Sequence, residues 1–262
     1  MGSRRRLGGW IAAMLVAAPV SAQPPASTAE AADLVADRPG FNAPASVVGA
    51  GVVQVELGWS TVRWRDGTYG SIGPQPLLRV GVARLVEVQV ASAGLAAGCV
   101  ADCQWHGTDV AVGTRARLPR EPFGVALAAT GLVSLPTGAT ALTSGFVDPL
   151  VILQADRSLG AFFELSYNYL FTRVHDEDDA RGFVRSGHGV SLGAAAGRWT
   201  PFVAVAWRPV HVEGDVPWLA QAGTGFRLAT DVQLDVSLDR GLNAVEPWWG
   251  VSAGLVVRHR PR

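Results

Sequence analysis

The sequence contains no lysine, so all 22 of its basic residues are arginines, and 22 acidic residues balance them to a formal net charge of zero. We attach no mechanism to the choice of arginine. The zero balance excludes the broad basic field by which nucleic-acid-binding proteins attract phosphates. Charged residues amount to 17% of the chain, which is below the roughly 25% that is usual in soluble domains.

Long apolar runs are lacking beyond the N-terminus. The start, "MGSRRRLGGWIAAMLVAAPVSAQ", has three arginines, a short apolar core and a small-x-small end at Val20-Ser21-Ala22. This pattern predicts a secretory signal peptide over residues 1–22, with a retained membrane anchor as the alternative. The remaining residues include no uninterrupted apolar stretch of about 20 residues, which excludes helical membrane spans. An exported chain of this kind can enter a bilayer only as a closed sheet.

Cysteines are scarce as well, with only Cys99 and Cys103 in "GCVADCQWHG". In an oxidising compartment, this pair predicts a small disulfide that closes a loop. His106 lies nearby, but no fourth ligand is evident in the sequence, so we predict neither a metal nor a cofactor.

Apolar and polar residues alternate with a period of two from Gly51 onward. In "ATDVQLDVSLDRGL" (229–242), every second residue from Val232 to Leu238 is apolar, and the residues between them are polar. A period of two predicts β-strands with one apolar and one polar face. About twelve such segments follow one another, each of roughly membrane-spanning length. The sequence therefore predicts an all-β domain over 51–258, preceded by an irregular periplasmic leader (23–50) and followed by a short periplasmic tail (259–262).

The lengths of the connections decide which face is covered. Connections alternate between short ones, such as "AR", "DRS" and "RWT", and long ones, such as "RDGTYGSIGPQ" and "SLPTGATALTSGF". Short turns at one end and long loops at the other are typical of an up-and-down antiparallel transmembrane β-barrel. A soluble sandwich with Greek-key connections has no reason to sort its loops in this way, although a secreted soluble β-protein is the alternative.

Aromatic residues on the apolar faces support the barrel. They fall into two groups, one toward the long loops and one toward the short turns, as interfacial girdles do. The first group is Trp59, Tyr169, Phe171, Trp207, Trp218 and Trp249, and the second is Phe123, Phe163 and Phe226. The apolar faces are therefore expected to contact lipid, and the polar faces to line the lumen.

Two classes of outer-membrane enzyme fit the sequence poorly. Phospholipases of this kind carry His and Ser on the lipid face, whereas His188 and Ser191 fall on opposite faces of one strand. Outer-membrane proteases place Asp and His pairs at the outer rim, and "VHDEDDARG" and "HVEGD" supply such residues without fixed spacing. Nucleophile-elbow and zinc-protease motifs are missing. We predict that the protein is not an enzyme.

Several short segments, taken in order, resemble the outer-membrane transporter family named after the MetA-type pathway of phenol degradation. They are Asp37-Arg38-Pro39-Gly40-Phe41; Gln54, Glu56 and Gly58; Leu78, Arg79 and Gly81; Gly107 and Asp109; "LPTG" (135–138); "VDP" (147–149); and "QLDVSLDRGLN" (233–243). The resemblance implies a β-barrel of the outer membrane with a transport role. Barrels of the family usually end with an aromatic residue on the last strand, whereas this chain ends "LVVRHRPR".

The polar faces carry the candidate pore-lining residues. These are Glu56, Arg79, Glu87, Asp109, Arg115, Arg117, Asp231 and Asp235. One interpretation is that these charges pair and partly fill the interior, because isolated charges in a low-dielectric wall are costly. The other is that they set the selectivity of a narrow path. Asp37 and Arg38 of the leader form a candidate plug, with Arg38 expected near Asp231 and Asp235, and an ordered periplasmic lead-in is the alternative.

These observations predict a barrel in the outer membrane of a Gram-negative bacterium that mediates passive transport of small molecules, with aromatic or other hydrophobic solutes as candidates. The alternative is a non-conducting structural or adhesion barrel that acts through its extracellular loops. The expected partners are outer-membrane lipids and lipopolysaccharide, the barrel-assembly machinery and a small-molecule solute, with no nucleic acid.

Overall fold

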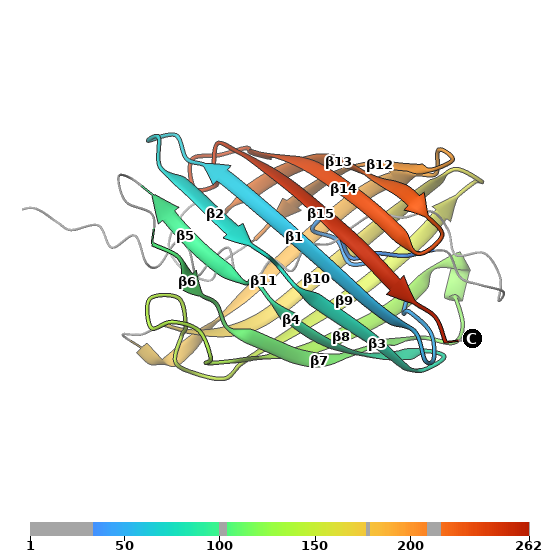
Figure 1. The fold of residues 1–262 in the computed structure, drawn as a ribbon, viewed down its shortest axis with the longest axis horizontal. Helices are drawn as coiled ribbons and strands as arrows, with labels where there is room; N and C mark the ends of the chain where they lie inside the picture. The colour runs from blue at the N-terminus through green and yellow to red at the C-terminus, as the bar shows by residue number, and fades with distance from the viewer. Residues whose placement is uncertain (1–33, 100–103, 177–178, 209–215, 262) are drawn as a thin grey trace, which may run out of the picture.

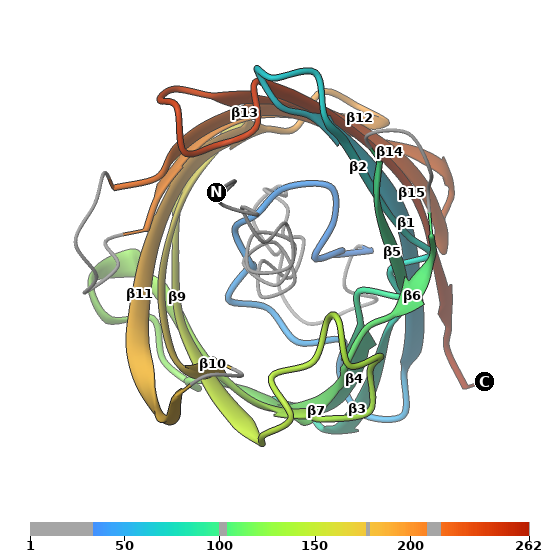
Figure 2. The same cartoon turned by 90° about the vertical axis from the view of Figure 1, so that its left-hand side faces the viewer.

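The computed structural model describes residues 34–99, 104–176, 179–208 and 216–261. Within these residues, twelve strands close an antiparallel barrel, in which the last strand returns to pair with the first (Figures 1 and 2). The predicted up-and-down barrel of about twelve strands is therefore confirmed. The predicted signal peptide lies outside the described residues.

The described residues form fifteen strands. Twelve of them make up the barrel wall, and three short ones extend the wall at one end. The wall strands are β1 (Val53–Arg63), β3 (Leu77–Ala83), β4 (Val86–Ser92), β7 (Val110–Arg117), β8 (Ala126–Leu135), β9 (Asp148–Leu159), β10 (Phe163–Asp176), β11 (Asp179–Ala194), β12 (Trp199–Trp207), β13 (Trp218–Ala229), β14 (Val232–Gly241) and β15 (Trp249–His259). The extensions at the long-loop end are β2 (Tyr69–Gly73), β5 (Leu95–Cys99) and β6 (His106–Gly107). A single 3₁₀ turn, η1 (Pro122–Gly124), lies between β7 and β8. Among the described residues, no helix is long and apolar enough to cross a membrane.

Parts of the segments that the sequence analysis treats as long loops form β-strands in the structure. β2, β5 and β6 pair with one another beyond β3, β4 and β7, and β2 also pairs with β1. Pro74 and Pro76 separate β2 from β3, because proline donates no hydrogen bond to a strand ladder. Gly94, with φ +82°, separates β4 from β5, and a Cβ there would lie 1.6 Å from the Pro74 carbonyl oxygen. The breaks in neighbouring strands therefore lie side by side in the wall.

The two faces of the wall differ as the sequence predicts. In β14, Leu234, Val236 and Leu238 are exposed on the outside, whereas Gln233, Asp235 and Ser237 are buried on the inside. A barrel turns its apolar face to lipid and its polar face inward, the reverse of a soluble protein. The exposed valines and leucines form the lipid-facing band.

Aromatic side chains cross the long-loop end of this band. Tyr169, His188, Trp207 and Trp218 occupy paired positions on β10 to β13. Trp207 stacks against His188 and Trp218, with ring centroids 5.0 and 5.2 Å away. Such a row is typical of a membrane interface.

A charge in the middle of the lipid-facing band should destabilise the protein. We expect Val236→Arg, in the middle of β14, to lower the free energy of unfolding by about 2–4 kcal/mol, because a guanidinium group at the bilayer midplane loses its hydration. Val82→Arg, next to the short β3–β4 turn, should cost only about 0–1 kcal/mol. Denaturant unfolding in phospholipid vesicles measures both, and equal costs would contradict the proposed depth of β14.

Candidate functional site

Residues 34–50 of the leader lie inside the barrel (Figure 2). Hereafter, "the leader" means these residues. They pass around the inner wall and contact most of its strands in turn. The contacts run from Leu34 at Val256 of β15, through Phe41 at Phe202 of β12 and Ala45 at Asp156 of β9, to Val48 at Glu87 of β4. The leader therefore forms an incomplete ring against the wall.

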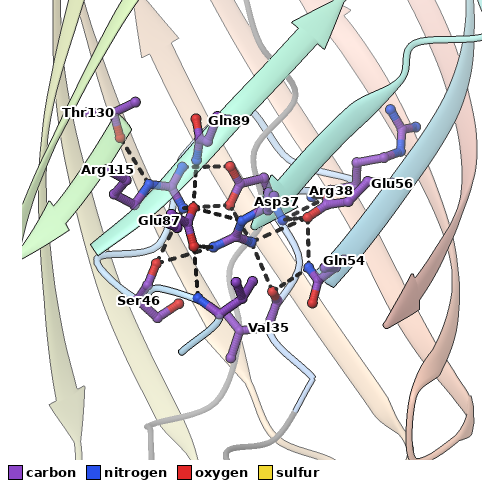
Figure 3. A network of polar contacts seen from close by, with 12 residues as sticks. Val35, Asp37, Arg38, Ser46, Gln54, Glu56, Glu87, Gln89, Arg115 and Thr130 are labelled. Atoms are coloured by element: carbon purple, nitrogen blue, oxygen red, sulfur yellow. Dashed lines mark hydrogen bonds and ion pairs between the residues drawn. The ribbon is translucent and has the colours of Figure 1, made fainter. Parts of the chain in front are cut away.

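Asp37 is the most strongly bound residue of the leader (Figure 3). Both of its carboxylate oxygens accept hydrogen bonds from Arg115 of β7, at 2.9 and 2.6 Å. Arg79 of β3 lies 3.0 Å from the same carboxylate. Burial alone raises the pKa of the Asp37 carboxyl, but the Arg115 and Arg79 guanidinium groups outweigh it and hold that pKa below its ordinary value.

The wall supplies two more carboxylates that complete this network. Glu87 of β4 accepts two hydrogen bonds from Arg79, at 2.8 and 3.0 Å, and one from the Val48 backbone N–H at 2.7 Å. Glu56 of β1 accepts the backbone N–H groups of Asp37 and Arg38. Because all these side chains are almost completely buried, each charge depends on its partners, and losing one partner of such a pair costs about 3–5 kcal/mol.

The Arg38 side chain contacts the neighbouring part of the wall, near β1, β14 and β15. Its guanidinium group donates to the Gln75 side chain and to the Ala253 carbonyl, at 3.1 and 3.0 Å. Its Nε lies 3.5 Å from Asp235. The two neighbouring leader residues thus bind adjacent parts of the wall, Asp37 the arginines of β3 and β7 and Arg38 an aspartate of β14.

Glycines on the inner wall make room for the leader. Gly58 of β1 and Gly254 of β15 are paired residues. A Cβ on Gly58 would lie 1.8 Å from an Arg38 nitrogen, and one on Gly254 would lie 2.3 Å from Arg38 Nε. Only a residue without a side chain therefore fits at these two positions while Arg38 is in place.

The structure separates the remaining candidate residues from this network. Arg117 forms an ion pair with Glu121 near the short-turn end. Asp109 accepts hydrogen bonds from the Gly138 N–H and the Thr143 hydroxyl, and so fixes the β8–β9 loop. We expected Asp231 beside Arg38, and this is wrong. Asp231 lies in the β13–β14 turn, where it pairs with Arg258 and Arg260 at 2.8 and 2.9 Å.

Several residues of the site were not among the candidate pore-lining residues. Gln54 and Gln89 donate to Glu56 and Glu87, and the Thr130 hydroxyl accepts from Arg115. Strand parity could have placed them inside, but not beside these charges. His188 and Ser191 lie on opposite faces of β11, where His188 bonds Tyr167 and Ser191 lies next to Asn42. Cys103 lies outside the described residues, so the disulfide stays a prediction.

The inner face of β8, β9 and β10 becomes apolar toward the long loops. On β8, β9 and β10, the inward positions change from Thr130, Gln154 and Asn168 to a layer of larger apolar side chains. This layer consists of Leu132, Ile152 and Leu170, with Leu142 of the β8–β9 loop also buried. On these three strands, an apolar layer therefore lies above the charged level that holds the leader, whereas β13 and β14 stay polar toward the long loops, with Gln221 bound to Asp239.

A closed barrel with an apolar exterior, an aromatic band at the long-loop end and polar side chains inside defines an outer-membrane β-barrel. A family model described as "Putative MetA-pathway of phenol degradation" matches residues 36–258. The chain therefore belongs to this family, as its sequence segments indicate. No curated protein matches the chain.

Solved structures share the barrel architecture. An outer-membrane channel from Pseudomonas putida F1 is 16% identical, with a TM-score of 0.56 over 82% of this chain and 97% of that chain. The β domain of a Bordetella autotransporter is 13% identical, with a TM-score of 0.46 over 79% and 99%. A loop-deletion mutant of a Vibrio cholerae outer-membrane protein is 9% identical, with a TM-score of 0.44 over 79% and 99%.

A side chain at Gly58 should displace Arg38 from the wall. We expect Gly58→Leu to accelerate hydrogen–deuterium exchange of residues 37–42 by about 100-fold, because the substitution breaks the ion pair between Arg38 and Asp235. Gly131→Leu is the matched control, since a Cβ on Gly131 meets nothing within 4 Å. Unchanged exchange in Gly58→Leu would show that Arg38 does not need this space.

Proposed function

We propose that this barrel lies in the outer membrane of a Gram-negative bacterium and carries small apolar molecules, aromatic ones included, passively toward the periplasm. The observation that supports this most is the change of the lining on β8, β9 and β10 from polar to apolar toward the long loops. An apolar solute that passes along these strands from the long-loop end meets Leu132, Ile152 and Leu170 before it reaches Thr130 and the neighbouring Arg115.

The charged level that holds the leader is the proposed constriction. Glu56, Arg79, Glu87, Arg115 and Asp235 are its pore-lining residues, and the leader partly fills the lumen there as a plug. Charged side chains that line a narrow pore determine which solutes can pass through it. Pairing with the leader neutralises these charges, so the passage that remains presents little net charge to a solute.

Location and partners follow from the barrel. Outer-membrane barrels place long loops outside the cell and short turns in the periplasm. We therefore assign the β8–β9 and β14–β15 loops to the cell surface and both chain ends to the periplasm. Lipopolysaccharide would surround the outer part of the wall, the barrel-assembly machinery would insert the chain, and the signal peptide over 1–22 would be removed.

The alternative is a non-conducting barrel whose surface loops bind partners or support the envelope. Liposome swelling separates the two. Proteoliposomes should swell at a rate that falls with solute size if the protein is a pore, and tight vesicles would favour the structural barrel.

Removing the leader should open the lumen. We expect deletion of residues 23–45 to raise single-channel conductance in planar bilayers several-fold, because the largest obstruction in the middle of the barrel is lost. Deletion of residues 261 and 262, beyond the end of β15, is the control. If conductance does not change when residues 23–45 are deleted, the leader is no plug.

Acid should also raise the conductance, but more gradually than deletion of the leader does. The pKa of Asp37 lies below its ordinary value of 3.8, so ionised Asp37 stabilises the bound leader fully at neutral pH. This stabilisation is lost as the pH falls below about 3.8 through the lowered pKa. We expect conductance to rise in that acid range, and Asp37→Asn to show raised conductance already at pH 7. Asp66→Asn, in an exposed loop, should behave like the unmodified protein, and an identical response in Asp37→Asn would rule out Asp37 as the group that responds to acid.

A further inference from the structure

The outer face of the barrel carries a row of arginines at the long-loop end that the interior does not explain. Arg63, at the end of β1, is the paired neighbour of Trp249 on β15, and Trp249 is in turn the paired neighbour of Arg240 on β14. The three strands lie side by side (Figure 1). Arg63 and Trp249 share the outward parity of Trp59, and Arg240 that of Leu238. Two guanidinium groups therefore flank one indole ring on the outer surface.

Aromatic rings and backbone carbonyls hold these arginines in place. The Arg63 guanidinium lies 5.2 Å from the Tyr69 ring centroid, and that of Arg240 lies 5.3 Å from the Trp248 ring centroid. Arg240 also donates to the Trp248 carbonyl at 3.1 Å. Arg65, in the β1–β2 loop, donates to the carbonyls of Gly241 and Asn243. Arg65 thus adds a third guanidinium group beside the end of β14.

No acidic side chain neutralises this cluster. Within the part of the chain that the structure describes, none of Arg63, Arg65 and Arg240 forms an ion pair with a carboxylate. Most of the donors of each guanidinium group are consequently available to a ligand. Arginine at an interface matches phosphate, which its planar fork can bind through two hydrogen bonds.

A shallow apolar groove runs along the wall next to Arg240. Its volume is about 560 Å³, and its floor contains Ala220 and Ala222, whose small side chains leave the wall thin there. One side is formed by Val203 and Val205, and the other by Leu238. The groove lies just below the row of Trp207 and Trp218, with Arg240 on its border. An acyl chain in this groove would have its headgroup at the level of the arginines.

We propose that this surface is a binding site for lipopolysaccharide. The site consists of Arg63, Arg65, Arg240 and Trp249, together with the groove over β11 to β14. The arginines bind the phosphates of the lipid A headgroup, and the groove holds one of its acyl chains. Arg63 and Arg240 are two strand spacings apart, about 10 Å, so the site suits a ligand with more than one anionic group. The inference rests on the proposed outer-membrane location but not on transport.

The test is a titration of purified, delipidated protein with bisphosphorylated lipid A, followed by native mass spectrometry. Monophosphorylated lipid A and phosphatidylglycerol are the comparison ligands. We expect bisphosphorylated lipid A to bind tightest. Arg240→Gln and Arg63→Gln should each weaken it about fivefold, and the double variant about 25-fold, since one arginine near an anionic lipid surface contributes about a factor of five. Ala222→Phe, which fills the groove, should weaken binding without removing charge.

The matched control is Arg157→Gln, because Arg157 is an exposed arginine of outward parity near the short-turn end of β9. It should leave lipid A affinity unchanged. Heat-modifiable migration on gels shows that each variant is folded. The proposal is overturned if Arg157→Gln weakens binding as much as Arg240→Gln, if the three lipids bind equally, or if a dimer that persists without lipid occupies the groove. Liposome swelling rates measured on the same variants separate lipid binding from transport. A variant that loses lipid A binding but still swells leaves the transport proposal standing, and a protein that binds lipid A but does not swell leaves the lipid site standing.

Discussion

The ion pairs of Asp37 with Arg79 and Arg115 connect the leader to the wall, and the interior depends on them. A barrel in lipid directs its polar side chains inward, where twelve strands leave a lumen too wide for wall side chains alone to fill. Charges exposed in such a space would need water or partners. The leader supplies those partners, with a carboxylate for the wall arginines and backbone N–H groups for the wall carboxylates.

The same logic explains why the wall carries buried carboxylates and arginines where the leader runs. Glu56 and Glu87 accept backbone N–H groups of the leader as well as arginine hydrogen bonds. On β8, β9 and β10, above this level and toward the long loops, Leu132, Ile152 and Leu170 replace the polar side chains.

The architecture could be predicted from the sequence because a strand has a strict period of two. Alternation in 229–242, together with the sorting of short and long connections, predicted the barrel and the inward direction of Asp235. The partners of these residues could not be predicted. The leader has no periodicity, so nothing in the sequence indicates that Asp37 faces Arg115 while Arg38 faces Asp235. Gly58 and Gly254 become a shared space for Arg38 only once the first and last strands are paired. The extensions β2, β5 and β6 were missed because Pro74 and Gly94 read as loop residues.

The two ends of the Asp37-Arg38 pair differ in strength. Asp37 receives two short hydrogen bonds from Arg115 and a close contact with Arg79. Arg38 is 3.5 Å from Asp235, whose carboxylate oxygens accept no hydrogen bond from the residues that the structure describes. Because charge-assisted hydrogen bonds are roughly twice as strong as neutral ones, the contact on the β14 side is the weaker of the two. Arg38 is therefore held in place more by its hydrogen bonds to Gln75 and to the Ala253 carbonyl than by its ion pair with Asp235.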